Sequence, residues 1–289
     1  MSPAASVVVP AHNASSAVPA LLASLDEQTL DDFEVVVVDN ASTDDTAAVA
    51  ARMGARVVSE PRPSRARARN AGVAAAVAER IAFIDAECAA EPGWLQALVR
   101  CLDRAPLVAG PVRVRTSAAP GLLERFDALW RFHQREHAER DGWAASANLA
   151  ITRRTFDAIG GFDPAYVHIG EDVDLCLRAG AAGYRIAFCP AAWISHPAED
   201  SLEATLRRAY RQGWSMVQHH HRLPGPIGGR LHLHPGPLLR GDWALRRFGI
   251  DPDALGAAER RRMLRLARLE YAARMAGSLR AELSPRRAR

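Results

Sequence analysis

The chain has 289 residues, of which 48% are hydrophobic and 24% are charged, a composition typical of a folded globular protein and not of a disordered one. All 37 basic residues are arginine, which excludes a P-loop lysine and a lysine Schiff base. No apolar run reaches the roughly 18 residues that span a bilayer, and the first ten residues lack the features of a secretory signal. We therefore expect a cytoplasmic protein, with membrane association as an alternative.

The net charge of +4 is unevenly distributed. Residues 201–289 contain 18 Arg and 7 acidic residues, whereas residues 1–200 contain 19 Arg and 26 acidic residues. This contrast predicts an acidic body followed by a basic, mainly helical extension over 201–289. The cysteines form no C-x-x-C pair, and we expect buried thiols rather than a zinc site or disulfides; they are Cys88, Cys101, Cys176 and Cys189.

The first hundred residues alternate short β-branched runs with Ala/Leu-rich helical stretches. The expected strands are 6–9, 33–38, 56–59 and 81–84. The expected helices are 15–25, 44–53, 64–78 and 92–104. Strands that alternate with helices predict an α/β fold with a mainly parallel sheet flanked by helices.

The second half of the chain has a looser pattern. Expected there are a strand (107–115), an amphipathic helix (121–140), a helix (171–180), a strand (184–188), a loop (224–237) and two terminal helices. Leu206, Tyr210 and Val217 belong to an apolar stripe at helical spacing beside several arginines. The stripe predicts either packing against the preceding domain or an interfacial helix over 201–222 that contacts anionic lipid.

Polar loops follow three of the predicted strands, and ligands bind at the carboxyl ends of the strands in such sheets. Asp85 and Glu87 follow an apolar strand and point the same way if the segment is extended. Their oxygens suit Mg²⁺ or Mn²⁺, although capping of the next helix would also explain them. No G-x-G-x-x-G follows the first strand, so a dinucleotide site is not expected.

Two further clusters carry charge. Glu171, Asp172 and Asp174 stand at a helix start, where they could cap the helix or where an Asp could act as a general base. Asp174 lies four residues before Arg178, which predicts an ion pair. The second cluster could bind phosphate or form an exposed basic turn; its members are Arg62, Arg65, Arg67 and Arg69.

His133 and His137 match the H-x-x-E-H pattern of zinc proteases. No third ligand is identifiable, so an ordinary solvated helix face is the preferred interpretation. His219, His220 and His221 are interpreted as solvated or acceptor-facing side chains.

Seven segments in chain order closely resemble family 2 glycosyltransferases of the GT-A fold, over about residues 6–197. They are VVVPAHN (7–13), VVVDNASTDDT (36–46), ARNAG (68–72), FIDAE (83–87), GGFD (160–163), EDVDLCLR (171–178) and His196. The resemblance implies an inverting, metal-dependent hexosyltransferase that moves a sugar from a nucleoside-diphosphate sugar to an acceptor hydroxyl. The acceptor could be a glycan, a lipid-linked molecule or a small molecule.

The resemblance also assigns roles to residues. Asp172 takes the position of the catalytic base, and Mn²⁺ or Mg²⁺ would be held by Asp85, Glu87 and His196. The donor would contact Pro10, Ala11, Asn13, Asp39, Arg65, Arg69, Asp85, Ser146 and Glu171. Residues 1–110 would bind the nucleotide sugar and residues 111–200 would form the acceptor side. A nucleotidyltransferase and a non-catalytic nucleotide-sugar-binding protein of the same fold are the alternatives, and no nucleic acid partner is expected.

Overall fold

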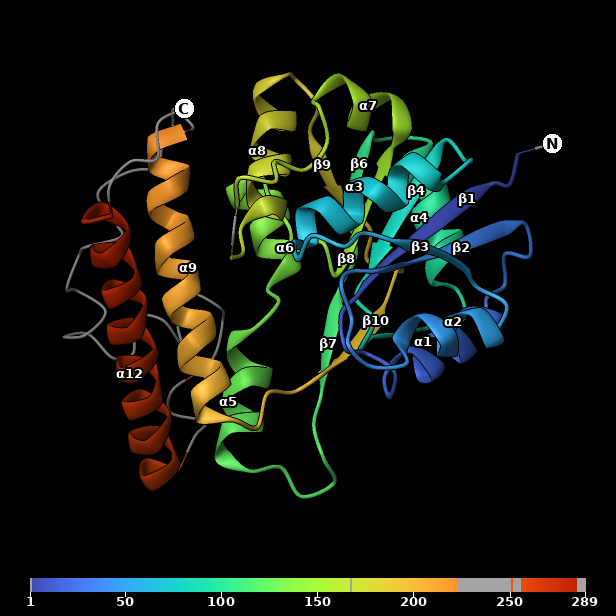
Figure 1. Cartoon of the computed structure of the whole chain (residues 1–289). Helices are drawn as coiled ribbons and strands as arrows, with labels where there is room; N and C mark the ends of the chain where they lie inside the picture. The colour runs from blue at the N-terminus through green and yellow to red at the C-terminus, as the bar shows by residue number, and fades with distance from the viewer. Residues whose placement is uncertain (1, 167, 223–250, 252–255, 285–289) are drawn as a thin grey trace. The chain divides into compact units, whose positions relative to one another are not determined.

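The structure is a computed structural model that describes residues 2–166, 168–222, 251 and 256–284 (Figure 1). Two compact units make up the chain. The first contains Met1–Arg115, Phe132–Val167 and Glu171–Pro197. The second contains Thr116–Arg131, His168–Gly170 and Ala198–Arg289.

A seven-stranded sheet with the order β3-β2-β1-β4-β8-β6-β9 forms the centre of the first unit. Its strands are β1 (Ala5–Ala11), β2 (Phe33–Asp39), β3 (Arg56–Ser59), β4 (Arg80–Ile84), β6 (Leu107–Ala109), β8 (Asn148–Thr152) and β9 (Ile186–Phe188). Only β8 runs antiparallel to its neighbours, β4 and β6. The predicted α/β fold with a mainly parallel sheet is confirmed, but β8 was not predicted.

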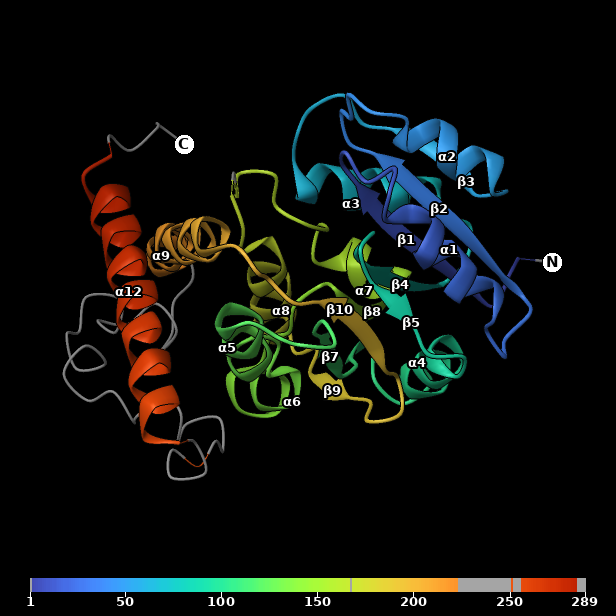
Figure 2. The same ribbon diagram turned by 90° about the horizontal axis from the view of Figure 1, so that it is seen from below.

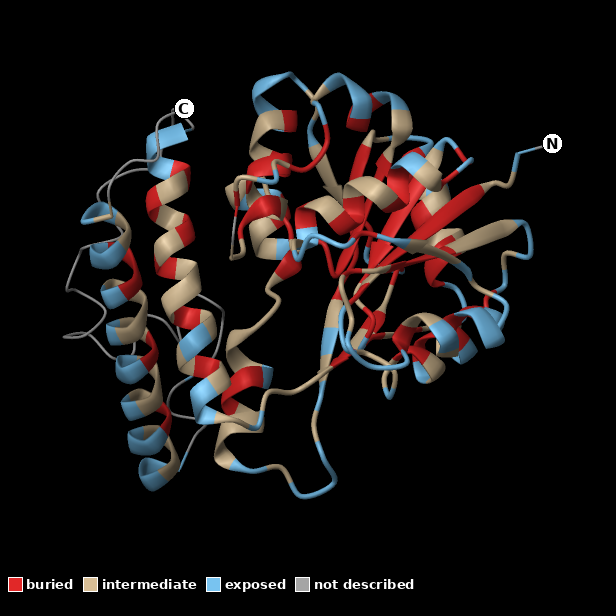
Figure 3. Cartoon of the chain, viewed as in Figure 1, coloured by how far each residue is buried: buried red, intermediate tan, exposed pale blue. Residues whose placement is uncertain are grey.

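Helices cover both faces of this sheet. They are α1 (Val18–Asp26), α2 (Thr46–Arg52), α3 (Arg65–Ala75), α4 (Trp94–Leu102), α7 (Arg153–Ala158) and α8 (Glu171–Ala181). Successive side chains of a strand point to opposite faces, so β1 sends Val7 and Val9 into a core with α1 and α4, and Val8 into a core with α3 and α8. The central strands β1, β4, β6 and β8 are accordingly buried along most of their length (Figure 3), which explains their apolar sequences, whereas the edge strands β3 and β9 have no fully buried residue.

A second sheet of three short strands has the order β5-β10-β7. Its strands are β5 (Ala89–Ala90), β7 (Val112–Arg115) and β10 (Ile194–Pro197), and Figure 2 shows β10 beside β5. The predicted strand 107–115 is therefore wrong as one element, because it divides at Gly110-Pro111 between the two sheets. At Gly110 a Cβ would overlap the carbonyl oxygen of Ala192 and the side chain of Asn148.

The predicted helix 121–140 is also divided. Helix α5 (Leu122–Trp130) ends, the backbone of Phe132 adopts a φ of +57°, and α6 (Gln134–Glu136) and the π-helical turn η1 (His137–Asp141) follow. A residue whose backbone is in the left-handed conformation cannot continue a right-handed α-helix. The amphipathic pattern therefore identified the helical residues but not the break.

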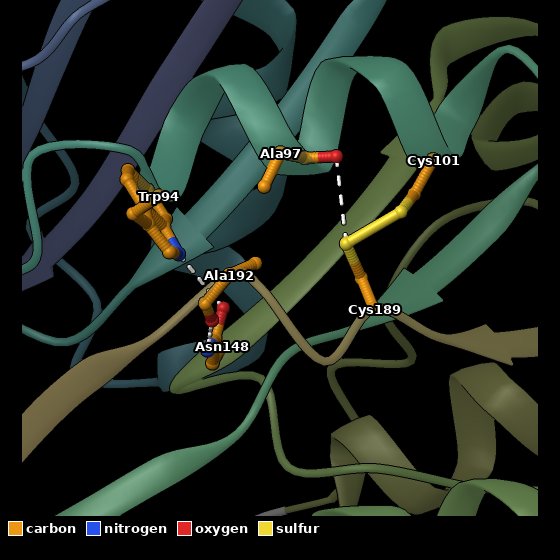
Figure 4. The surroundings of a disulfide bond; sticks show 6 residues. All are labelled: Trp94, Ala97, Cys101, Asn148, Cys189 and Ala192. Carbon is orange, nitrogen blue, oxygen red and sulfur yellow. Dashed lines mark hydrogen bonds between the residues drawn. A yellow bond between two sulfur atoms is a disulfide. The ribbon is translucent and has the colours of Figure 1, made fainter.

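Cys101 and Cys189 form a disulfide between α4 and the residue that follows β9 (Figure 4). Their Cα atoms are 6.3 Å apart. The prediction of buried thiols is wrong for this pair, because 88 residues separate the two cysteines and only the folding of the sheet brings them together. Cys88 and Cys176 are buried thiols, and burial raises the pKa of Cys176 to about 12.

The second unit contains α5, α9 (Leu202–Arg222) and α12 (Ala257–Glu282). Helices α9 and α12 pack backbone to backbone, since a Cβ on Gly213 would overlap the carbonyl oxygen of Arg274 and one on Gly277 would overlap that of Tyr210. The predicted helical extension is thus present, whereas the predicted loop 224–237 lies outside the described residues. Within the described ranges, no helix has the length and apolar character needed to cross a membrane.

Reduction of the disulfide should lower the melting temperature of the protein. A cross-link between residues 88 apart restricts the unfolded chain, which corresponds to at most about 4 to 5 kcal/mol in the chain-entropy description. We expect dithiothreitol to lower the melting temperature of the wild type and to leave that of a Cys101→Ser/Cys189→Ser variant unchanged in a thermal unfolding scan. Equal responses of the two proteins would contradict the pairing.

Candidate active site

The loops after β1 and β2 are joined by hydrogen bonds at one edge of the sheet. The side-chain oxygen of Asn13 accepts a hydrogen bond from the backbone N–H of Thr43 (2.8 Å). The backbone N–H of Asn13 donates a hydrogen bond to Oγ of Ser42 (3.0 Å). Asn13 adopts a φ of +50°. Asp39, at the end of β2, accepts a hydrogen bond from the N–H of Ser42 (3.3 Å). Parallel β1 and β2 thus bring together four predicted donor-binding residues: Pro10, Ala11, Asn13 and Asp39.

Asn40 is a site residue that the sequence analysis missed. Its buried amide donates to the carbonyl oxygens of Glu60 (3.0 Å) and Arg62 (2.9 Å) and accepts from the N–H of Ser64 (2.8 Å). Ser64 in turn caps α3 by accepting from the N–H of Arg67. Asn40 therefore fixes the segment that carries the predicted arginines, and its position directly after Asp39 was the available signal.

Asp85, Glu87 and His196 form the one group of three potential metal ligands among the described residues. One ligand atom from each lies within 4.8 Å of the others. Asp85 and Glu87 follow β4, and β10 brings His196 to them through its pairing with β5. The second sheet therefore completes the group with His196, which is more than one hundred residues from the two acids in sequence.

The imidazole of His196 is oriented for a role as a ligand. Its Nδ1 lies 2.7 Å from the carbonyl oxygen of Pro197, which can only accept, so Nδ1 carries the hydrogen. Its Nε2 faces Oε1 of Glu87 at 3.3 Å. Burial tends to raise the pKa of Glu87, but the hydrogen bond and charge of His196 outweigh it and lower that pKa to about 2. Histidine ligands commonly have such a second-nitrogen contact to a carbonyl.

Arg69 is buried between two carboxylates. Its two terminal nitrogens bond to Oδ1 of Asp85 (2.9 Å) and Oε1 of Glu171 (2.7 Å), and its side chain is 2% exposed. Both terminal nitrogens are thus directed at protein carboxylates, and the predicted contact of Arg69 with the donor stays a prediction. Asp85 retains its second oxygen, Oδ2, for other contacts.

Arg65, one turn earlier on α3, is exposed. Its positive charge acts favourably on the carboxylates of Glu87 and Glu171, although burial raises the net pKa of Glu171. Arg62, by contrast, makes a two-point ion pair with Glu60, at 2.9 Å for each contact. Of the four predicted arginines, Arg65 is the one that is exposed and close to the acidic cluster.

Asp172 lies at the start of α8 and is half-buried. Its Oδ2 accepts hydrogen bonds from the N–H (3.1 Å) and the hydroxyl (3.5 Å) of Ser146. The neighbouring Glu171 is buried on Arg69, and burial followed by the charge of Asp172 raises the pKa of Glu171. The predicted pair Asp174–Arg178 is confirmed at 2.6 Å.

The H-x-x-E-H pattern does not assemble a metal site. His133 occupies the N-cap position of the short α6. Nδ1 of His137 lies 2.9 Å from a carboxylate oxygen of Asp141, and the ring of His137 stacks on Trp143 with centroids 3.9 Å apart. Neither histidine belongs to the metal-ligand group found among the described residues. A zinc protease is therefore not supported.

The chain is similar to several known proteins. The model of the family described as Glycosyl transferase family 2 matches residues 6–162. An uncharacterised glycosyltransferase of Mycobacterium tuberculosis is 36% identical over 187 residues, which are 63% of this chain and 82% of that protein. A pre-mycofactocin glycosyltransferase of the same species is 30% identical over 84% of this chain and 52% of its own length.

A solved structure supports the same fold. It is the mannosyltransferase of Pyrobaculum calidifontis in complex with GDP-Man and Mn²⁺, with a TM-score of 0.64, 19% identity, and coverage of 98% of this chain and 88% of that one. The chain belongs to glycosyl transferase family 2. Its fold is GT-A, and it is a glycosyltransferase, as the sequence resemblance predicted.

Replacement of Arg69 by methionine should destabilise the protein. The change leaves Asp85 and Glu171 without their buried counter-charge, and loss of one partner of a buried ion pair costs about 3 to 5 kcal/mol of unfolding free energy. Urea unfolding at neutral pH measures this loss. Arg67→Met, on the less buried side of the same helix, is the matched control and should cost much less.

The loss should depend on pH. Burial raises the pKa of Glu171 above its unfolded value, so the folded state is favoured when Glu171 is neutral and loses stability as the pH rises through the folded pKa. The charge of Arg69 opposes this rise, so the pKa of Glu171 should be higher still in Arg69→Met, and the difference in stability between the variant and the wild type should shrink as the pH falls below neutral. A loss that does not change with pH would indicate packing rather than charge.

Proposed function

We propose that this glycosyltransferase is inverting and metal-dependent, and that it transfers a hexosyl group from a nucleoside-diphosphate sugar to an acceptor hydroxyl. The observation that carries the proposal is that Asp172 lies in the same unit as the ligand group Asp85, Glu87 and His196. Arg69 connects the two, because it pairs with Asp85 and with Glu171, the residue next to Asp172. The solved relative that was crystallised with GDP-Man and Mn²⁺ supports this class of donor.

The residues fit a divalent cation. Two carboxylates and an imidazole are suitable ligands for Mn²⁺ or Mg²⁺, and ligand atoms within 4.8 Å of one another need only small side-chain movements to meet one ion. A bound cation would supply Lewis-acid stabilisation for the leaving diphosphate. The choice between Mn²⁺ and Mg²⁺ belongs to the proposal, and the imidazole nitrogen favours Mn²⁺.

Transfer requires one displacement at the anomeric carbon of the donor. The acceptor oxygen forms a bond to that carbon, the bond from the carbon to the diphosphate oxygen breaks, and the proton of the acceptor hydroxyl moves to Asp172. Ser146 holds Oδ2 of Asp172 by two hydrogen bonds, which fixes the orientation of the carboxylate. General-base assistance of this kind contributes about 10² to 10⁴-fold to the rate.

The other predicted residues divide between the two ends of the donor. Asp39 and Asn13, with the backbone at Pro10 and Ala11, would contact the nucleoside, and exposed Arg65 would contact the diphosphate. Arg69 and Glu171 would act through Asp85 and Asp172 rather than by touching the donor. Residues 1–110 would bind the donor and residues 111–200 would receive the acceptor, with the helical extension after residue 200 outside the catalytic domain.

Asp172→Asn should abolish transfer and retain donor binding, because the amide keeps the shape of the side chain and cannot accept the proton. Hydrolysis-corrected transfer rates from a panel of nucleotide sugars, together with calorimetric binding of the donor, measure the two effects. The control is Asp157→Asn, which makes the same change at an exposed position of α7 and should leave transfer unchanged. Near-normal turnover of Asp172→Asn would remove this residue from the role of base.

The product should have inverted stereochemistry. A single displacement converts an α-linked donor into a β-linked product, and the proton coupling at the anomeric carbon in NMR spectra of the product distinguishes the two. An α-linked product from an α-linked donor would contradict the proposed mechanism.

A further inference from the structure

Helix α12 has an outer face that packing among the described residues does not explain. Its inner face is buried at Met263, Glu270, Gly277 and Ser278, and Ser278 donates a hydrogen bond to the carbonyl oxygen of Gly213 in α9 (3.0 Å). The exposed positions lie along the other side of the helix (Figure 3). Between residues 261 and 283, every exposed residue except Glu282 is Arg, Leu or Ala.

The charge on this outer face is positive. Five exposed arginines provide it: Arg261, Arg262, Arg265, Arg268 and Arg280. The three acids of the helix pair with residues other than these five arginines. Glu259 pairs with Arg125 (3.0 Å), Glu270 with Arg274 (2.8 Å) and Glu282 with His221 (3.4 Å). None of the five arginines takes part in an ion pair between described residues, so no described acid compensates their charge.

The same face also exposes leucine. Leu269, Leu279 and Leu283 are 49%, 54% and 70% exposed, and they are three of the six large exposed hydrophobic residues in the described part of the chain. Ala272 and Ala276 complete the exposed surface between them. An ordinary solvated helix face carries acids and neutral polar residues as well, and this face has neither apart from Glu282.

We infer that the outer face of α12 docks the protein on an anionic lipid bilayer, with the helix lying in the plane of the headgroups. The arginines would contact lipid phosphates and the leucines would enter the boundary with the acyl chains, as in other interfacial helices. A nucleic acid would engage the arginines but would leave the leucines in water, and no aromatic side chain is exposed on this face for stacking on bases.

Helix α9, which the sequence analysis considered for this contact, is less suited to it. Of its predicted apolar stripe, Val217 is buried and Leu206 and Tyr210 are half-buried, and the neighbouring Gly213 lies against the backbone of α12. The lipid-facing surface is therefore placed on α12. Its test is separate from that of the proposed function, because vesicle binding requires neither donor nor metal.

Co-sedimentation with phosphatidylcholine vesicles, with and without phosphatidylglycerol, tests the inference on the full chain. We expect binding only to the vesicles that contain phosphatidylglycerol, and weaker binding as salt is added. The variant Arg261→Gln/Arg265→Gln/Arg268→Gln should need about a hundredfold more lipid for half-maximal binding. The control, Arg52→Gln/Arg100→Gln/Arg104→Gln, removes the same charge from exposed positions of the first unit and should bind as the wild type does.

A second variant separates insertion from charge attraction. Leu279→Ser/Leu283→Ser keeps every arginine and should also weaken vesicle binding, while circular dichroism confirms that the helix is intact. The inference is overturned if phosphatidylglycerol does not promote binding at low salt, if the control loses as much binding as the α12 variant, or if the leucine variant binds as tightly as the wild type. Preferential binding of duplex DNA over vesicles, lost in the arginine variant, would also overturn it.

Discussion

The buried arginine between Asp85 and Glu171 is the interaction on which the candidate site depends. Four acids, Asp85, Glu87, Glu171 and Asp172, approach one another from the end of β4 and the start of α8, and their mutual repulsion would separate these elements without a counter-charge. Arg69 bonds to one acid from each element. It therefore fixes the distance between the candidate metal ligand and the candidate base, and a fixed arrangement of charge is what stabilises a transition state efficiently.

The two sheets position different residues of the candidate site. The parallel strands β1, β2 and β4 end at one edge and present Asn13, Asp39 and Asp85 there. The small sheet brings His196 to Glu87, and Asn148 secures the connections by bonding to Trp94 and to the carbonyl oxygens of Pro111 and Ala192. Because these bonds are buried, the segment that includes Ser146 is held rigidly beside Asp172.

The sequence allowed most of the first sheet and the chemistry of its edge to be predicted. Alternating apolar strands and helices are local signals, and Asp39, Asp85 and Asp172 stand in short motifs that follow or begin an element. The disulfide, the antiparallel β8 and the break at Gly110 could not be predicted, because each depends on contacts between residues far apart in the chain. The two carboxylate contacts of Arg69 could not be predicted for the same reason, because an arginine beside a phosphate and one between two carboxylates have the same local sequence.

Thermal unfolding with UDP, GDP and dTDP, each with and without Mn²⁺, tests the central claim that Asp85, Glu87 and His196 hold a cation for a nucleoside diphosphate. A ligand that binds the folded state at a hundredfold excess over its Kd stabilises it by about 2.7 kcal/mol. We predict that one nucleoside diphosphate raises the melting temperature only when Mn²⁺ is present, and that Asp85→Asn removes the effect. A rise that is the same without Mn²⁺, or no rise with any of the three, would contradict the account.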